Sequence, residues 1–394
     1  MGCCCFKLLL FEVWLITLIL ASALNIFHPL LLYYPSELGG TANTIYRINS
    51  ALEKKGIETC VLSTLYGLQG KDLSKHQFDE DLKKVRFVKS SIFYFLLRSI
   101  KFVRKCDIIQ FSSIFFPPTL PLILIAIIYN KKILLSPRGE LYESAIARKS
   151  LKKNIYLRFI RIFQKKINFV ATCKAESEII SSRFPGASSI EIIPNFIEVK
   201  ARVLKQLNNQ FVFLGRINPI KNLEALIKAF AQLKNSKCDG LKLHLMGSAK
   251  LEYEKKYLSE LNELIKFLKV KDKIFFHGHI TGKEKDDILA SSLALILPSH
   301  SENFGNVVLE ALALGTPVIA SKNTPWNVLE KYYAGYHVDN DPNSLSEAML
   351  SILNQNDIEG ETMRSNAYDL CNLKFNIDNN IDLWVEYYKR IISG

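Results

Sequence analysis

The feature that most constrains this chain is an alternation of two sequence patterns that runs through most of its length and occurs twice. From Leu24 onward, short apolar runs rich in β-branched residues alternate with stretches of helical periodicity, which is the pattern of parallel α/β sheets. The first series predicts strands at residues 24–28, 58–63, 85–89, 107–111, 132–136, 168–173 and 190–193. The second series predicts strands at residues 211–214, 241–246, 273–276, 293–297 and 317–320.

A chain of 394 residues is too long for one ordinary hydrophobic core. The two series therefore predict an α/β fold of two doubly wound parallel-sheet domains that face each other across a cleft. Pro194-Asn195 marks the crossover, so we expect a first domain at 24–195 and a second at 196–373. Residues 374–394, with a helix at 377–392, are expected to cross back to the first domain. Capping-box patterns from Thr281 and from Ser344 predict two helix starts.

Residues 1–23 form an apolar extension that allows several interpretations. Its uncharged run, 13–24, is shorter than the roughly 20 residues of a membrane-spanning helix. Ala21-Ser22-Ala23 follows Lys7 and an apolar region, as a signal-peptidase site does. A monotopic anchor is a variant of this interpretation. The alternative is a non-native extension before the first strand.

The net charge restricts the class of partner, and the cysteines indicate the cellular compartment. A formal net charge of +13 predicts an anionic partner, which is a nucleic acid, an acidic membrane or a phosphorylated substrate. Nucleic acid is not expected, because the chain has no zinc-finger, RNP-like or helix-turn-helix pattern. None of the eight cysteines forms a CxxC pair, which indicates reduced thiols in a cytoplasmic protein. We expect no metal: His277-Gly278-His279 lacks a third ligand, and Asp339-Asn340-Asp341 is expected to form a turn.

Two glutamates flank the start of a predicted helix in "SENFGNVVLEALALGTPVIAS". A helix is predicted at 306–314, so Glu302 lies in a loop at the carboxyl end of a parallel strand, where such folds bind ligands. The helix N-terminus suits phosphate, and Gly305 permits close approach of the backbone. Glu302 and Glu310 repel phosphate, so they are expected to bind hydroxyls, one of a sugar and one of a ribose. The alternative is a solvated Glu310 and a Glu302 that complements the helix dipole.

Two further loops fit the same ligand. Gly215 and Arg216 follow the strand at 211–214, and Lys221 precedes the next helix, so both cations are placed to neutralise a diphosphate. In the first half, Gly39-Gly40 follows the opening strand and precedes a helix predicted at 42–55, where backbone amides can close over phosphate.

These features together resemble glycosyltransferase family four (glycosyl transferases group 1), whose members are retaining enzymes of the two-Rossmann GT-B fold. The resemblance is densest at 211–340. It implies that Arg216 and Lys221 bind the donor diphosphate, that Glu310 binds the nucleotide ribose and that Glu302 contacts the donor sugar. The expected donor-binding set is Gly39, Gly40, Gly215, Arg216, Lys221, Asn303, Phe304, Gly305, Asn306, Val307 and Glu310. The expected catalytic set is Glu302, Arg138, Arg216 and Lys221.

One stretch departs from the family pattern. Many members have a histidine after the strand that matches 132–135, but this chain has Ser136-Pro137-Arg138-Gly139, a stretch shared with some bacterial surface-polysaccharide enzymes. Arg138 is expected to bind the donor sugar, the phosphate or an anionic acceptor, and the alternative is a turn with a solvated arginine. Gln110 and Ser112 also stand where relatives often have histidines, so no general base is assigned.

The expected function is that of a retaining glycosyltransferase in lipopolysaccharide, capsule or exopolysaccharide biosynthesis, with a nucleotide-sugar donor, a glycan or lipid-linked acceptor and no cofactor. A GT-B epimerase and a non-catalytic nucleotide-sugar-binding paralogue remain alternatives. Residues 91–105 and 148–166 form basic amphipathic stretches, which favour contact with an anionic membrane. We therefore expect a cytoplasmic protein that is peripheral at the inner face of the cytoplasmic membrane.

Overall fold

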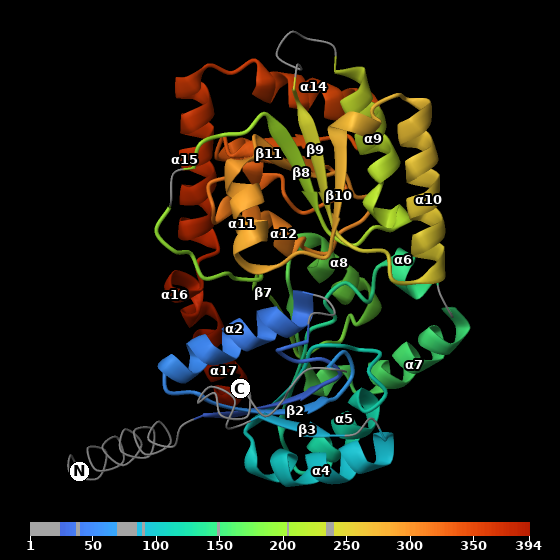
Figure 1. Ribbon diagram of the computed structural model, residues 1–394. Helices are drawn as coiled ribbons and strands as arrows, with labels where there is room; N and C mark the ends of the chain where they lie inside the picture. Colours follow the sequence, from blue (N-terminus) through green and yellow to red (C-terminus); the bar gives the residue numbers. More distant parts are fainter. Residues whose placement is uncertain are drawn as a thin grey trace, which may run out of the picture. The chain divides into compact units, whose positions relative to one another are not determined.

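The computed structural model describes residues 24–36, 40–68, 85–88, 91–147, 150–202, 205–233 and 240–394 (Figure 1). They form two compact units. Unit 1 contains the described residues up to Ala171, with Glu176–Ile193 and Ile381–Gly394, and unit 2 contains Thr172–Ala175 and Pro194–Asn380. The apolar extension 1–23 and Gly39, for which predictions are made above, lie outside the described residues.

Unit 1 is built on a parallel sheet of seven described strands in the order β3-β2-β1-β4-β5-β6-β7. The strands are β1 Asn25–Leu30, β2 Glu58–Thr64, β3 Val85–Val88, β4 Ile108–Phe111, β5 Lys132–Leu135, β6 Ile167–Ala171 and β7 Ser189–Ile192. The helices are α2 Gly40–Lys54, α4 Ile92–Lys105, α5 Thr119–Ile128, α6 Glu143–Ile146, α7 Ser150–Ile162, η2 Gln164–Lys166, α8 Lys174–Arg183 and α17 Asp382–Ser393.

Unit 2 repeats this plan with a parallel sheet of six described strands in the order β10-β9-β8-β11-β12-β13. Its strands are β8 Gln210–Leu214, β9 Lys242–Met246, β10 Ile274–Gly278, β11 Ala294–Leu297, β12 Val318–Ser321 and β13 Gly335–Val338. Its helices are η3 Pro219–Lys221, α9 Leu223–Gln232, α10 Glu252–Phe267, η5 Lys271–Lys273, α11 Gly282–Ser291, α12 Asn306–Leu312, α13 Val328–Lys331, α14 Pro342–Leu353, α15 Asp357–Lys374 and α16 Ile377–Asn380.

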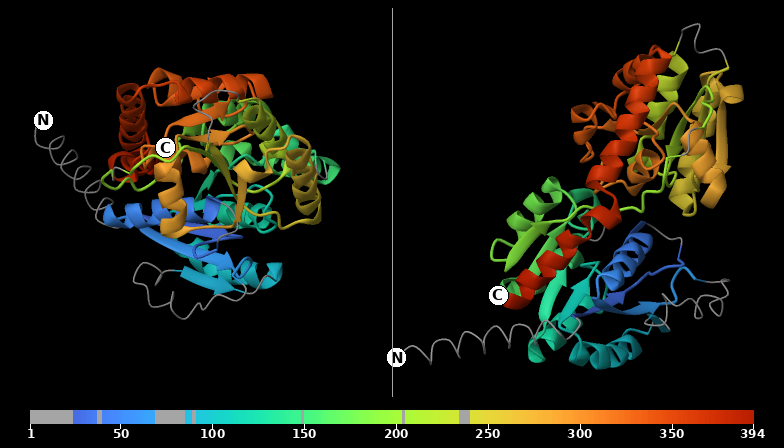
Figure 2. Two further views of the ribbon diagram at one scale, coloured as in Figure 1. Left: turned by 45° about the horizontal axis from the view of Figure 1, so that its top comes forward. Right: turned by 90° about the vertical axis from the view of Figure 1, so that its left-hand side faces the viewer.

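Both faces of each sheet are covered by helices, which explains why the strand sequences are apolar throughout (Figures 1 and 2). In β8, Phe211 and Phe213 pack in one cluster with α9, α10 and α14, whereas Val212 packs in a second cluster with α12 and α15. Successive residues of a strand point to opposite faces. Doubly wound parallel α/β architecture is thereby confirmed for both units, and the predicted strands are present with ends that differ by two residues at most.

Two local predictions are wrong. The helix expected at 377–392 is two helices, α16 and α17, that break at Ile381. The capping box at Ser344 does not start α14, because Asp341 occupies the N-cap and Pro342 the first turn. The Asp341 carboxylate accepts from the Asn343 and Ser344 amides at 2.9 and 3.1 Å, and proline suits the first helical position. At α11 the start after Thr281 is correct, although the Thr281 side chain makes no capping bond.

The helix α17, at the end of the chain, belongs to unit 1. Tyr388 Oη donates to Gln110 Oε1 of β4 at 2.6 Å, and Tyr387 Oη donates to the Phe169 carbonyl of β6 at 3.0 Å. Trp384 and Tyr388 are almost fully buried. These contacts fix α17 against β4 and β6 of the unit 1 sheet.

Candidate functional site

The strand order places the candidate site in unit 2. The chain starts this sheet at β8 and continues to β9 on one side and, later, to β11 on the other side. The carboxyl ends of β8 and β11 therefore flank the point at which the strand order reverses, which is where open α/β sheets bind ligands. Gly215, Arg216 and Lys221 follow β8, and Glu302 follows β11. The fold thus brings the two predicted loops to one position.

The loop after β8 passes very close to the loop after β9. The Gly215 amide donates to the Met246 carbonyl at 2.9 Å, and Gly215 has a φ of +155°. A Cβ at Gly247 would lie 1.7 Å from the Gly215 carbonyl oxygen. Only glycine fits at 247 without displacing this backbone.

Lys221 and Glu302 form an ion pair between Nζ and Oε2. Their side chains are 15% and 19% exposed, so the pair is largely shielded from water yet reachable. The two loops are also joined by a hydrogen bond from the His300 amide to the Ile220 carbonyl at 2.8 Å. The site thus holds a cation and an anion in contact, and each can exchange its partner for a ligand group of the same charge.

Glu310 has its own basic partner, Lys285 of α11. Lys285 Nζ lies 2.6 Å from Glu310 Oε2, and the side chains are 19% and 22% exposed. Burial acts to lower the pKa of Lys285, but the charge and hydrogen bond of Glu310 outweigh it and raise that pKa. The sequence does not predict the role of Lys285, because α11 carries two lysines and three acidic residues in succession and no local signal distinguishes this lysine.

The turn between Glu302 and α12 is fixed from the core side. Gly305 has a φ of +83°, and a Cβ there would lie 3.1 Å from Leu297 Cδ2 and 3.3 Å from Trp326 Nε1. Trp326 Nε1 donates to the Phe304 carbonyl, and the Phe304 ring packs edge-on against Trp326 at 5.2 Å. The Phe304 side chain is therefore an anchor in the core, which leaves its backbone for the site.

The asparagine side chains of the turn are engaged with other segments of unit 2. Asn303 Nδ2 donates to Thr172 Oγ1 at 2.9 Å, and Asn195 Nδ2 donates to Asn306 Oδ1 at 2.7 Å. Val307 is partly buried against the core cluster of α12. Because these side chains are already hydrogen-bonded or packed, the predicted binding of the donor by these residues depends on their backbone amides.

Arg216 is in a different environment from Lys221. Its side chain is 70% exposed and its Nη1 lies 3.8 Å from Glu254 Oε1 of α10, a carboxylate that is 1% exposed. Glu254 also accepts from the Lys250 and Leu251 amides at 2.9 and 3.0 Å. The structure therefore places Arg216 at the end of β8 as a solvent-facing guanidinium.

In unit 1, the Ser136-Pro137-Arg138-Gly139 stretch forms a tightly held turn after β5. Arg138 and Gly139 both have left-handed backbones, with φ values of +50° and +85°. The Gly139 amide donates to Glu176 Oε1 at 2.6 Å, and Glu140 Oε2 accepts from the Ile114 amide at 2.6 Å. Burial lowers the pKa of Arg138 to about 10, although Glu176 and Tyr388 oppose this. Arg138 is thus a largely buried cation on a strained turn, not a solvated one. Gly40 begins α2 and is exposed.

His28 of β1 lies close to this turn and was not predicted from the sequence. It is fully buried, and neither ring nitrogen has a hydrogen-bond partner among the described residues. Burial, followed by the positive charge of Arg138, lowers the pKa of His28 to about 3. His28 is therefore neutral wherever the protein is folded at ordinary pH.

Acid should destabilise the protein through His28. Between pH 6.5 and 3 an unfolded histidine takes up a proton that folded His28 does not. The free energy of unfolding therefore decreases as the pH is lowered through this window. At pH 5 this loss is about 2 kcal/mol relative to pH 7. Urea unfolding of the wild type and of His28→Gln at both pH values measures it, and the variant should lack this part of the loss. Equal losses in both proteins would contradict the assignment.

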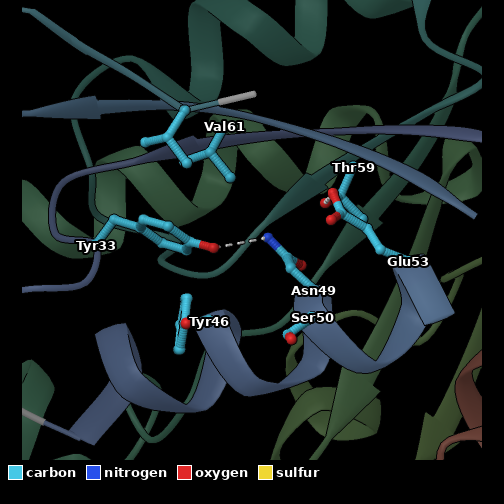
Figure 3. A pocket seen from close by; sticks show the side chains of 8 residues that line it. Tyr33, Tyr46, Asn49, Ser50, Glu53, Thr59 and Val61 are labelled. Atoms are coloured by element: carbon cyan, nitrogen blue, oxygen red, sulfur yellow. Dashed lines mark hydrogen bonds between the residues drawn. The ribbon is translucent and has the colours of Figure 1, made fainter. Parts of the chain in front are cut away.

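Three other features are excluded as the main site. A cavity of about 10 Å³ lies beside α2, where Asn49 Nδ2 donates to Tyr33 Oη at 3.4 Å (Figure 3). It is large enough for a single water molecule at most. The chain bends at Asn340 and Asp341 after β13. The Asp339 carboxylate binds Lys322, and the Asp341 carboxylate caps α14. His277 Nε2 lies 2.7 Å from His244 Nδ1, and the described residues contain no group of three or more potential metal ligands.

Comparison with known proteins places these loops in a family context. Residues 196–370, which contain all the unit 2 residues discussed above from Gly215 to Glu310, match the family model for glycosyl transferases group 1. D-inositol 3-phosphate glycosyltransferase of Arthrobacter sp. (strain FB24) is 28% identical over 177 residues, which are 41% of this chain and 41% of that protein. Alpha-monoglucosyldiacylglycerol synthase of Streptococcus pneumoniae (strain ATCC BAA-255 / R6) is 29% identical over 186 residues, 44% of this chain and 40% of that protein. The chain therefore matches less than half the length of these curated relatives.

The fold itself has a match along nearly the whole chain. The crystal structure of Anabaena Alr3699/HepE in complex with UDP superimposes with a TM-score of 0.76 at 16% identity, and covers 93% of this chain and 100% of that one. The class of fold is therefore GT-B, as predicted. The family model, by contrast, matches residues 196–370, which lie within unit 2.

Proposed function

We propose that this protein is a retaining glycosyltransferase that moves a sugar from a nucleotide-sugar donor to a glycan or lipid-linked glycan acceptor. The pathway proposed is lipopolysaccharide, capsule or exopolysaccharide biosynthesis. The observation that carries the proposal is the presence of two ion pairs, Lys221–Glu302 and Lys285–Glu310, at the carboxyl edge of the unit 2 sheet. The first pair offers a cation for phosphate, and each pair offers a carboxylate for hydroxyls.

Donor binding exchanges partners within the Lys221–Glu302 pair. A diphosphate oxygen replaces Glu302 as the partner of Lys221, and this frees the Glu302 carboxylate to accept hydrogen bonds from hydroxyls of the donor sugar. The exposed Arg216 turns toward the same diphosphate. Glu310, held by Lys285, accepts from the ribose hydroxyls. No metal is needed in this scheme, because two basic side chains neutralise the diphosphate.

Transfer then proceeds at the anomeric carbon. The C–O bond to the diphosphate breaks toward an oxocarbenium-like state, while Lys221 and Arg216 stabilise the charge on the departing phosphate. The acceptor hydroxyl attacks from the same face and forms the new C–O bond. Its proton passes to the departing phosphate oxygen, so no side chain is required as a covalent nucleophile.

Known relatives support both substrates. The Anabaena neighbour was solved with UDP, and the Streptococcus pneumoniae relative is named for a glucosyldiacylglycerol product. We propose a UDP-type donor and a lipid-linked acceptor on this basis. In the described residues, no helix has both the length and the apolar character needed to cross a membrane. We therefore propose a peripheral attachment at the inner face of the cytoplasmic membrane, through exposed apolar and basic residues of α4 and α7.

A panel of UDP-, GDP- and ADP-sugars tests the proposal against its alternatives. A transferase should hydrolyse one donor slowly without acceptor, release a sugar that first has the anomeric configuration of the donor, and keep this activity in EDTA. Conversion of one nucleotide-sugar into its epimer would favour the epimerase. Binding of a donor without any turnover, even with lipid-linked glycan extracts, would favour the non-catalytic paralogue.

A further inference from the structure

A basic groove lies between α7 and α8 of unit 1. Its volume is about 690 Å³. The polar side chains that line it are Asn154, Arg158, Arg161, Ser182 and Arg183. The first three come from α7 and the last two from α8, both labelled in Figure 1.

The three arginines of this groove are not balanced by acids. Among the described residues, no ion pair or hydrogen bond joins Arg158, Arg161 or Arg183 to a carboxylate. The sequence of α7 contains no Asp or Glu at all. Three guanidinium groups around one groove repel each other, and an anionic ligand removes that repulsion. The planar fork of each guanidinium matches the geometry of a phosphate.

The outer face of α7 carries a row of exposed apolar side chains. Leu151, Ile155, Phe159 and Ile162 are 73%, 50%, 52% and 66% exposed. Their spacing of four, four and three residues puts them on one face of the helix. The inward face is formed by other residues, Leu157 and Ile160, which are buried. This apolar stripe therefore points away from the core of unit 1, with the arginine row along its side.

We propose that the groove binds phosphate headgroups of an anionic phospholipid bilayer while the apolar stripe of α7 enters the interface. A bilayer offers phosphodiester groups next to hydrocarbon, and the groove and stripe present arginines next to apolar side chains in the same arrangement. Free phosphate would account for the arginines but not for the stripe. The groove and the stripe supply a defined site for the peripheral attachment proposed above. This inference rests on the proposed function only for the purpose of that attachment, which is access to a lipid-linked acceptor.

The test is vesicle binding by the full-length protein. Flotation with phosphatidylcholine vesicles that contain phosphatidylglycerol should show strong binding of the wild type. The triple variant Arg158→Gln, Arg161→Gln, Arg183→Gln should bind about 100-fold more weakly, at roughly fivefold for each basic residue. The matched control removes three exposed lysines of unit 2, with Lys228→Gln, Lys271→Gln and Lys273→Gln, and should lose less than about fivefold. Equal losses in the two triple variants would overturn the proposal, because they would show a response to net charge alone.

Two further arms separate the site from its alternatives. Leu151→Ser with Phe159→Ser should weaken vesicle binding at least tenfold while the arginines are intact; unchanged binding would overturn the part assigned to the apolar stripe. Vesicles made equally negative with oleate in place of phosphatidylglycerol should bind the wild type several-fold more weakly, and equal binding would overturn phosphate recognition.

Calorimetry with UDP keeps this proposal distinct from the proposed function. The arginine variant should take up UDP as the wild type does, because the residues that hold the donor in the proposed mechanism, Lys221, Arg216 and Glu310, lie in unit 2. If the wild type bound vesicles but took up no nucleotide, the proposal for the groove would still hold and the proposed function would be wrong.

Discussion

Replacing Lys221 with methionine is expected to lower donor turnover by about 100- to 1,000-fold, which is the cost of removing one preorganised group that stabilises developing charge. Lys221 is only 15% exposed and its ammonium lies against Glu302 at the carboxyl edge of the unit 2 sheet. In the proposed mechanism this ammonium neutralises the leaving diphosphate, and Arg216 is too exposed to replace it. The measurement is release of UDP from the preferred donor, followed under saturating and limiting donor.

Two further variants distinguish a catalytic role of Lys221 from a structural one. Lys322→Met removes the lysine of another ion pair of unit 2, Lys322–Asp339, whose side chains are 55% and 65% exposed, and should leave turnover unchanged. The exchange Lys221→Glu with Glu302→Lys restores an ion pair, so the free energy of unfolding should recover while turnover should not. Full turnover in Lys221→Met, or in the exchanged protein, would show that Lys221 does not act on the donor.

Gly247→Ala is expected to have the largest effect on folding. The new Cβ would lie 1.7 Å from the Gly215 carbonyl oxygen, and backbone on both sides leaves no flexible group to move aside. Inserting atoms into a packed site costs about 1–3 kcal/mol and more when the backbone itself must shift. We expect a loss above about 3 kcal/mol, or a displaced loop from Gly215 to Lys221 with loss of donor binding. Chemical denaturation and nucleotide titration measure the two outcomes.

Gly360→Ala is the matched control for this substitution. Gly360 lies inside α15, and only Gln355 Oε1 comes within 4 Å of its added Cβ, at 3.8 Å. Alanine in a helix interior is favoured over glycine by about 1 kcal/mol, so this variant should be as stable as the wild type or more stable. If Gly247→Ala unfolded at the same denaturant concentration as Gly360→Ala and bound nucleotide normally, the close approach of the two loops would be refuted.

The sequence predicts the fold well because the relevant signal is local. The strands are buried on both faces, as in β8, where Phe211 and Val212 pack in different core clusters. The apolar run of such a strand is therefore visible in the sequence without knowledge of the neighbouring strands. The two acidic positions near α12 were also visible locally, since Gly305 and the preceding strand place them at a strand end. Helix ends are less visible in the sequence, because the Asp341 carboxylate that caps α14 lies in a segment whose pattern also fits a turn.

The partners of the site residues were not predictable in the same way. Lys285 and Glu310 are 25 positions apart, Lys221 and Glu302 are 81 apart, and Tyr388 and Gln110 are 278 apart. These contacts depend on the order of the strands in each sheet, which periodicity does not encode. The need for glycine at 247 and the burial of His28 beside Arg138 likewise appear only when the strands are paired.

The most direct test of the account is calorimetric titration of the full-length protein with UDP, GDP, ADP and their sugar conjugates, without added metal. The account predicts that at least one nucleotide binds at a single site with a Kd between about 1 μM and 1 mM, the usual range for enzyme substrates, and that Lys221→Met removes most of this affinity. Absence of heat from every nucleotide, or binding that is unchanged by Lys221→Met, would contradict the claim that the unit 2 loops hold a pyrophosphate.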